Sequence, residues 1–338
     1  MTMTHDPEPN FSRSATTKPT APTNNTIEGR VKQRWIPALM PSQEGRTAVV
    51  TGTGGLGLET AVALARTGAE VIVAGRDPAK GEAALARIRR EAPGTRVDFE
   101  RLDLASLASI AAFGAQLRNT RDRIDLLINN AAVMAPPRRR TTQDGFELQF
   151  GTNHLGHVAL TAQLLPLMHR APVPRVVSLS SVAARGAAMD LSDLQSERDY
   201  VPMTAYGRSK LACLLFASEL QRRSDEAGWG ITSIAAHPGV SRTELLPNGA
   251  GSRSVPGLVR RFLPFLFQPA AQGAWPTLFA STAPEAQPGG YYGPDRLGET
   301  RGHPAPARLP AGARDGAVAA RLWSLSEELV GMRLGEAR

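Results

Sequence analysis

The chain has 338 residues, 42% of them hydrophobic, so it can bury a core of normal size in one large α/β domain or two small ones. Its 39 Lys and Arg against 31 Asp and Glu do not predict nucleic-acid binding, because the arginines are spread along the chain and few aromatic residues accompany them. The single cysteine, Cys213, excludes an intramolecular disulfide. Because the sequence also lacks a membrane-spanning apolar run and a signal core, we expect a cytoplasmic protein.

The first 35 residues differ in composition from the rest of the chain. Residues 1–26 are rich in Thr, Pro, Asn and Ser and carry few apolar side chains. Such a segment buries too little apolar surface to offset the entropy that it loses on ordering. We therefore expect a disordered N-terminal extension over residues 1–35 and one folded domain over residues 36–338.

Short β-branched runs alternate with amphipathic stretches from residue 46 onward. The predicted strands lie, in chain order, at residues 47–51, 70–74, 97–102, 124–128, 175–179 and 231–236, with a further one near 291–292. The predicted helices lie at 56–66, 78–91 behind an Asp77 N-cap, 106–117, 145–169 and 205–223. This alternation predicts a Rossmann-type, doubly wound α/β domain with a parallel sheet of about seven strands flanked by helices.

A glycine-rich segment follows the first predicted strand and precedes the first helix. It comprises Gly52, Thr53, Gly54, Gly55, Leu56 and Gly57. Glycines at such a junction let the backbone turn tightly and approach a pyrophosphate, whose charge is stabilised by the helix N-terminus. We interpret the segment as a dinucleotide cradle rather than as a purely structural turn.

The residue after the second predicted strand bears on the choice of dinucleotide. An acidic residue there binds a ribose 2′-hydroxyl, whereas a basic residue accepts a 2′-phosphate. This chain has Arg76, and the following Asp77 is assigned to helix capping. Arg76 therefore favours NADP(H). If Arg76 only covers the surface, NAD(H) serves as well.

Further short motifs follow along the chain, in the order Asp103-Leu104, Asn129-Asn130-Ala131-Ala132, Asp144-Gly145-Phe146-Glu147, Asn153-His154-Leu155-Gly156-His157, Ser180-Ser181, Tyr206-Gly207-Arg208-Ser209-Lys210 and His237-Pro238-Gly239 with Thr243. Taken in this order over residues 46–333, the motifs resemble those of the short-chain dehydrogenase/reductase superfamily, and within it those of retinol dehydrogenases and of the oxidoreductase domain of WW-domain-containing oxidoreductase. Two departures stand out. The glycine loop is one residue shorter than the family pattern, and Ala132 replaces a glycine.

Tyr206 and Lys210 lie four residues apart on a predicted helix, so both project from one face. A neighbouring ammonium and a positively charged nicotinamide are expected to lower the pKa of the phenol, which then acts as an acid or a base near neutral pH. The resemblance implies that Tyr206 exchanges the proton with the substrate oxygen and that Lys210 also binds the nicotinamide ribose.

The resemblance implies two further catalytic residues. Ser181 matches the serine that orients and polarises the carbonyl, with Ser180 as the fallback. Ser180 is also suited to bonding backbone groups at a strand end. Asn153 is expected to hold a water that connects Lys210 to solvent, and its alternative interpretation is a local helix kink.

The remaining cofactor contacts are carried over by resemblance alone. Asp103 and Leu104 are expected at the adenine, and Asn130 and Ala131 along the ribose. Pro238, Gly239 and Thr243 are expected at the nicotinamide side.

Two other features complete the predictions. His154 and His157 lie one turn apart, but no third ligand has suitable spacing, so we assign them structural roles and predict no metal site. A variable substrate lid is expected around residues 245–270, where the segment 259–267 is either a wall for a lipophilic substrate, a contact with a membrane surface, or an ordinary packed helix.

The predicted function is NADP(H)-dependent interconversion of an alcohol and a ketone or aldehyde, on a lipophilic or bulky small molecule. Relatives commonly pair through the helices that hold Asn153 and Tyr206, so a homodimer is expected. The alternative is a non-catalytic NADP(H)-binding sensor or interaction protein with the same fold.

Overall fold

The computed structural model describes residues 1–2, 34–241 and 268–335, and Arg34–Arg338 form one compact unit. Three sequence predictions fall wholly or mostly on residues outside this part of the chain: the N-terminal extension over residues 1–35, the lid around 245–270, and Thr243.

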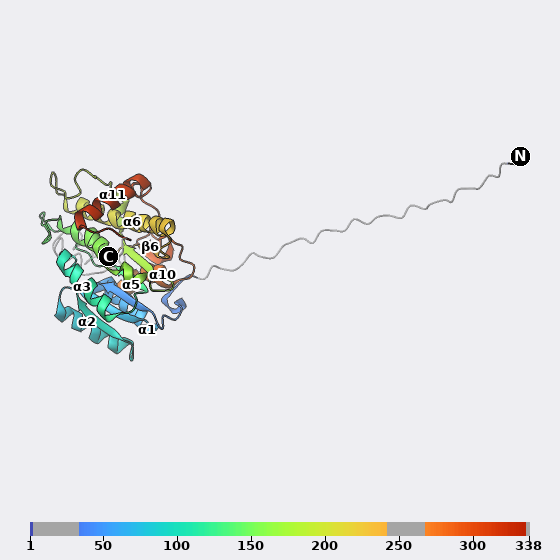
Figure 1. Cartoon of the computed structure of the whole chain (residues 1–338), viewed down its shortest axis with the longest axis horizontal. Coiled ribbons are helices and arrows are strands. Elements are labelled where there is room, and N and C mark those ends of the chain that lie inside the picture. The colour runs from blue at the N-terminus through green and yellow to red at the C-terminus, as the bar shows by residue number, and fades with distance from the viewer. Residues whose placement is uncertain (3–33, 242–267, 336–338) are drawn as a thin grey trace. The chain divides into compact units, whose positions relative to one another are not determined.

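An eight-stranded sheet with the order β3-β2-β1-β4-β5-β6-β7-β8 forms the centre of this unit (Figure 1). The first seven strands pair in parallel, as predicted, and β8 is antiparallel to β7. The strands are β1 Thr47–Thr51, β2 Glu70–Gly75, β3 Val97–Arg101, β4 Leu126–Asn129, β5 Arg175–Leu179, β6 Thr232–Ala236, β7 Tyr291–Arg296 and β8 Arg301–Pro306. The strand order reverses beside β1, and in such sheets a ligand crevice forms at the carboxyl ends of the strands that flank this point.

Strand β8 was not predicted from the sequence. It contains Pro304 and Pro306, which remove two backbone donors and argue against a central strand. At the edge of a sheet one side of the strand needs no ladder bonds, so the prolines are tolerated there and also discourage pairing with another chain.

The helices are α1 Gly55–Arg66, α2 Pro78–Glu91, α3 Leu107–Thr120, α4 Leu148–Phe150, α5 Gly156–Met168, α6 Pro202–Ala227, α9 Ala270–Gly273, α10 Trp275–Thr282 and α11 Gly316–Val330. The Asp77 carboxylate accepts hydrogen bonds from Ala79 N and Lys80 N, so the predicted cap of α2 is present. The helix predicted over 145–169 begins only at Leu148, and a π-helical turn at Gly151–Leu155 separates α4 from α5.

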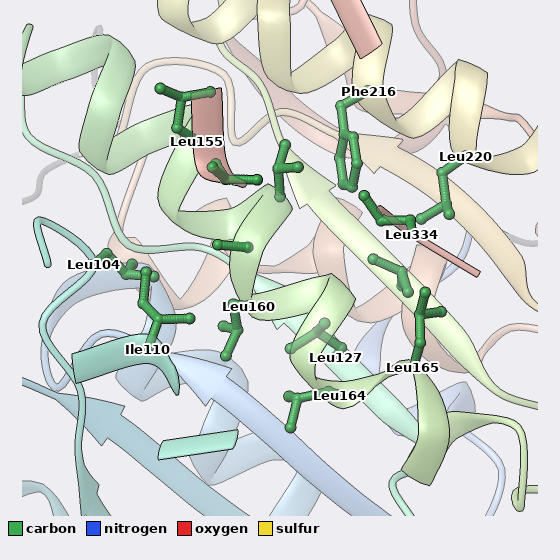
Figure 2. Packing of buried hydrophobic residues seen from close by; sticks show 14 of the residues in the cluster. Leu104, Ile110, Leu127, Leu155, Leu160, Leu164, Leu165, Phe216, Leu220 and Leu334 are labelled. Carbon is green, nitrogen blue, oxygen red and sulfur yellow. The ribbon is translucent and has the colours of Figure 1, made fainter. Parts of the chain in front are cut away.

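Two hydrophobic clusters attach these helices to the two faces of the sheet. Helices α3, α5, α6 and α11 contribute to one cluster, part of which is shown in Figure 2. Helices α1, α2 and α10 and the buried Trp35 contribute to the other. Leu160 and Leu164 of α5 are fully buried, and truncating such a leucine to alanine typically costs about 2–5 kcal/mol of stability.

Helix α11 packs on the helices that were expected to form a homodimer. Trp323 stacks on Phe216 of α6 with ring centroids 5.4 Å apart, and Ser326 Oγ lies 2.8 Å from His154 Nε2 in the π-helical turn. Pairing of two copies through α5 and α6 would therefore have to use the surface that α11 leaves uncovered, and the homodimer stays a prediction. Among the described helices, none combines the length and the hydropathy needed to cross a bilayer.

Candidate active site

The glycine-rich segment forms a tight junction between β1 and α1. Gly52 has φ of +104°, and its N–H donates to Ala74 O at 2.7 Å. A Cβ at Gly57 would lie 2.8 Å from Gly52 O and 3.1 Å from Thr51 O, so only glycine lets α1 begin in contact with the end of β1. The loop is one residue shorter than the family pattern, and it still makes the strand–turn–helix junction.

The N-terminus of α1 offers a place for an anion. Gly54 is exposed and faces open space, and no side chain caps the helix, whereas Asp77 caps α2. Uncapped N–H groups of a first helical turn bind phosphates through hydrogen bonds and the helix dipole. The residues present therefore fit the pyrophosphate of a dinucleotide.

Thr51 joins this cradle to the loop after β4. Its Oγ1 accepts hydrogen bonds from Asn130 N and Ala131 N, both at 2.9 Å, and lies 3.0 Å from His157 Nε2. His157 Nδ1 lies 2.9 Å from Asn153 O, which can only accept, so Nδ1 carries the proton and Nε2 accepts from Thr51. Burial lowers the pKa of His157 to about 4 and keeps the ring neutral. This arrangement agrees with the structural role assigned to the histidine.

Basic side chains surround the ends of β2 and β3. Arg76 is exposed directly after β2, and the strand register pairs Gly75 with Arg101, so Arg101 lies at the neighbouring strand end. Within residues 34–241 and 268–335, neither arginine forms an ion pair. Arg101 was not among the predicted site residues, although it lies near the end of the third predicted strand at 97–102.

The two residues expected at the adenine have clear structural partners. Asp103 Oδ1 accepts from Ala105 N at 3.0 Å, and Asp103 N donates to Ser109 Oγ at 2.9 Å. Leu104 is buried, and its carbonyl oxygen would be 2.4 Å from a Cβ at Gly156. Both residues follow the carboxyl end of β3, and their contact with the adenine stays a prediction.

Tyr206 and Lys210 project from α6 into one cavity, which they share with Ser181. The hydroxyl groups of Tyr206 and Ser181 form a hydrogen bond, and Lys210 Nζ donates to Leu179 O at 2.9 Å. Tyr206 is 6% exposed and Lys210 is 3% exposed. The spacing of four residues on one helix therefore brings both side chains to the end of β5, next to Ser181.

The protonation of Tyr206 differs from the expectation. Burial raises the pKa of Tyr206 to about 12, and the hydrogen bond from Ser181 opposes this only in part. Burial also lowers the pKa of Lys210. The expectation that the Lys210 ammonium lowers the pKa of the phenol was therefore wrong for the chain without a nicotinamide, because desolvation of the buried phenol dominates.

The two serines at the end of β5 have different partners. Ser180 is buried, and its Oγ donates to Lys210 O at 2.9 Å, so this hydroxyl provides a hydrogen-bond partner for a backbone carbonyl of α6. Ser181 Oγ accepts from Ala183 N at 3.2 Å and lines the cavity beside Tyr206. The geometry favours Ser181 over the fallback Ser180.

Asn153 lies in the π-helical turn and outside the cavity wall. Its side chain bonds to Val133 N, Val133 O and Ser209 Oγ at 2.8–2.9 Å, and thereby ties the loop after β4 to α6. Its carbonyl oxygen accepts hydrogen bonds from His157 Nδ1 at 2.9 Å and from Cys213 Sγ at 3.1 Å. The helix irregularity that was the alternative interpretation is present, and the water-holding role stays a prediction.

The cavity has a volume of about 350 Å³ and mainly apolar walls. The predicted site residues in its wall are Leu56, Asn130, Ser181, Tyr206, Lys210, Pro238 and Gly239. Those outside the wall are Gly52, Thr53, Gly54, Gly55, Gly57, Arg76, Asp103, Leu104, Ala131 and Asn153. The fallback residue Ser180 also lies in the wall. The wall residues that were not predicted as site residues are Ala132, Met134, Leu179, Val182, Ala183, Met203, Val240 and Ser241, and three of them, Ala132, Val182 and Val240, directly follow a predicted one.

Comparison with known proteins agrees with this geometry. The family model for short chain dehydrogenases matches residues 46–250. Mouse polyprenol dehydrogenase is 39% identical over 314 residues, which cover 91% of this chain and 90% of that protein. Mouse retinol dehydrogenase 13 is 42% identical over 299 residues, which cover 86% of this chain and 85% of that protein.

A solved structure shows the same fold. An uncharacterized protein from Mycobacterium paratuberculosis superposes with a TM-score of 0.74 at 39% identity, over 89% of this chain and all but 1% of that chain. The chain therefore belongs to the short chain dehydrogenase family and is an oxidoreductase that acts on CH–OH groups of small molecules with a nicotinamide dinucleotide.

Proposed function

We propose that this protein interconverts a lipophilic alcohol and its aldehyde or ketone with NADP(H). The observation that carries the proposal is the contact of Tyr206 with Ser181 inside an apolar cavity whose wall also includes Lys210 and Asn130. Asn130 links that cavity to the glycine cradle, because its backbone and side chain bond to Thr51.

The chain's own groups supply binding, orientation and proton transfer. A bound nicotinamide supplies the hydride acceptor or donor. The Ser181 hydroxyl orients and polarises the substrate oxygen. The Tyr206 hydroxyl gives a proton to that oxygen in reduction and removes it in oxidation. The Lys210 ammonium lies on the same face of α6 and adds positive charge near the reacting groups.

The cavity walls favour an apolar substrate. Ala132, Met134, Val182 and Ala183 present side chains without charge, and Met203 in the same wall is 48% exposed. A site of this kind binds a ligand through apolar burial and orients it with few polar groups. The names of two relatives, polyprenol dehydrogenase and retinol dehydrogenase 13, describe enzymes for lipophilic alcohols. We therefore assign the same substrate class to this chain.

The preference for NADP(H) rests on charge at the ends of β2 and β3. Arg76 directly follows β2, Arg101 ends the adjacent β3, and Lys80 lies in the first turn of α2. Three cations with no acidic partner in the described chain favour a 2′-phosphate over a 2′-hydroxyl. NAD(H) is the alternative if these side chains do not contact the ribose.

Calorimetry with NADPH and NADH tests the cofactor assignment. We expect NADPH to bind more tightly, and we expect Arg76→Ala and Arg101→Ala to weaken NADPH binding by about tenfold or more with little effect on NADH. Equal losses for both cofactors would contradict the 2′-phosphate role. Glu285→Ala, at an exposed site away from these strands, is the control.

Turnover of retinol and of a long-chain isoprenoid alcohol, compared with ethanol, tests the substrate class. We expect a higher kcat/KM for the two lipophilic alcohols. A protein that binds NADPH but oxidises no alcohol and reduces no aldehyde would instead be the sensor named as the alternative. Cytoplasmic location, membrane-surface contact and the homodimer stay predictions.

A further inference from the structure

Two segments of the cavity lining face the site from distant parts of the chain, and each is called a wall below. One wall includes Ser181, Val182 and Ala183, which follow β5 and begin the 3-10 turn η3 at Val182–Gly186. The other wall is formed by residues 238–241, which follow β6. The separation of these two segments decides how a substrate oxygen held at Ser181 is placed against a cofactor held at the loop after β6.

One carboxylate bridges the two segments. Glu299 Oε2 lies 3.0 Å from His237 Nε2 and accepts from Arg185 Nη2 at 2.5 Å. Arg185 belongs to η3, and His237 immediately precedes Pro238. Arg185 Nη1 also donates to Gly298 O at 2.8 Å. Both terminal nitrogens of the guanidinium therefore bind the turn that contains Gly298 and Glu299.

The direction of the histidine bond follows from its other partner. Gly239 N donates to His237 Nδ1 at 3.2 Å, so Nδ1 is the acceptor and the ring proton lies on Nε2, directed at Glu299. The imidazole is 0% exposed, and burial lowers its pKa to about 4, so the ring is neutral. Because the tautomer is fixed, His237 donates to Glu299 in one orientation only. This hydrogen bond therefore holds the start of the loop after β6 in a defined position.

The turn that carries Glu299 is strained and packs directly on that loop. Leu297 and Glu299 have φ of +48° and +65°, a region that non-glycine residues rarely adopt. Val240 N donates to Thr300 O at 2.8 Å, and a Cβ at Gly239 would lie only 2.3 Å from that oxygen. Strained backbone persists where the surroundings hold it, and such positions cluster at functional sites.

We propose that Glu299 is a positioning residue that holds the two walls of the active site at a fixed separation. It acts through Arg185 on the segment after Ser181 and through His237 on the loop after β6, and it does not contact the reacting atoms. This role rests on the proposed function, because it concerns the alignment of the substrate oxygen with the nicotinamide.

The substitution Glu299→Ala in the full-length protein removes both arms of the bridge. We expect the single-turnover hydride-transfer rate with NADPH and an aldehyde to fall at least tenfold. NADPH binding should also weaken, whereas the Kd of 2′-phospho-ADP-ribose, which lacks the nicotinamide, should stay within twofold of the unmodified protein. Glu285→Ala is the matched control, because it removes an exposed glutamate outside the site.

Two further variants separate positioning from simple loss of folding. In Glu299→Gln an amide oxygen in place of Oε2 still accepts from both Arg185 and His237, and the change removes only the hydrogen bond from Arg308 N to Oε1, so most of the rate should return. Arg185→Ala should reduce the rate less than Glu299→Ala, and the double variant should be no worse than Glu299→Ala alone, because both changes break the same bridge.

Hydrogen exchange provides a readout that needs neither cofactor nor turnover. In Glu299→Ala we expect faster exchange in peptides that cover residues 182–186 and 237–241, with the strands β1 and β4 unchanged. A hydride-transfer rate within twofold of the unmodified protein would overturn the proposal, as would equal weakening of NADPH and 2′-phospho-ADP-ribose. If the unmodified protein itself bound NADPH and transferred no hydride, the proposed function would fail, while the exchange result would still decide whether Glu299 holds the two walls.

Discussion

Replacing Tyr206 by phenylalanine removes one hydroxyl from the cavity and leaves the ring in place. The ring is buried, and the hydroxyl bonds to Ser181, which keeps a second partner in Ala183 N. Loss of one such hydrogen bond costs about 1 kcal/mol of stability, so the variant should fold. Because the phenol supplies the proton, kcat should fall roughly 10²–10⁴-fold, equivalent to about 3–5 kcal/mol of transition-state stabilisation.

The pH dependence of the two directions tests the same assignment. With a pKa of about 12, Tyr206 is protonated throughout the range from pH 6 to 9, so reduction should depend little on pH. Oxidation needs the phenolate, which is about one part in ten thousand at pH 8 for this pKa, and its rate should rise about tenfold per pH unit. A positively charged nicotinamide lowers the pKa and makes the rise level off earlier.

Steady-state and stopped-flow absorbance at the nicotinamide band measure both directions, and calorimetry measures cofactor affinity. Tyr200→Phe is the matched control, because burial also raises the pKa of Tyr200 to about 12 and its hydroxyl donates to Pro136 O outside the cavity. That control should keep full turnover. Turnover retained in Tyr206→Phe, or an oxidation rate independent of pH in the unmodified protein, would refute the proton-transfer role.

Three other changes test the packing of the fold. Gly57→Ala should destabilise the protein by about 1–3 kcal/mol and weaken cofactor binding, because the new methyl group meets the backbone oxygens of residues 51 and 52. The control Gly316→Ala places its methyl group in open space and should be neutral. Urea unfolding measures the stability of both variants. Trp323→Ala should cost about 3–5 kcal/mol, and Trp323→Phe much less, because the indole N–H has no partner among the described residues. Burial lowers the pKa of His154 to about 3, so the folded state favours the neutral ring; its stabilising contribution is present above pH 6.5 and is lost as pH falls towards 3. Unfolding at a series of pH values should show this loss in the native chain and a smaller one in His154→Leu.

Local sequence patterns were sufficient for the elements that are regular over several residues. The strands at 47–51 and 175–179 begin and end where the short apolar, β-branched runs predicted, and Asp77 caps α2 as its position before Pro78 indicated. The glycine cradle and the pair Tyr206 and Lys210 were found for the same reason. Their spacing along the chain sets their geometry, because one strand–helix junction or one helical turn contains the whole motif.

Other features depend on segments that meet only when the sheet is complete. Glu299 lies 114 residues from Arg185 and 62 from His237 in the sequence, and no local pattern links them. The same holds for α11 on α6 and for the apolar walls of the cavity. The direction of the Tyr206 pKa also needed the folded chain, because desolvation depends on everything that covers the phenol, and spacing reveals only the neighbouring ammonium. The sequence by itself determined the order of the parallel strands and the spacing of Tyr206 and Lys210. The tertiary structure decided which distant side chains surround them, because crossover connections bring the ends of the strands together from all parts of the chain.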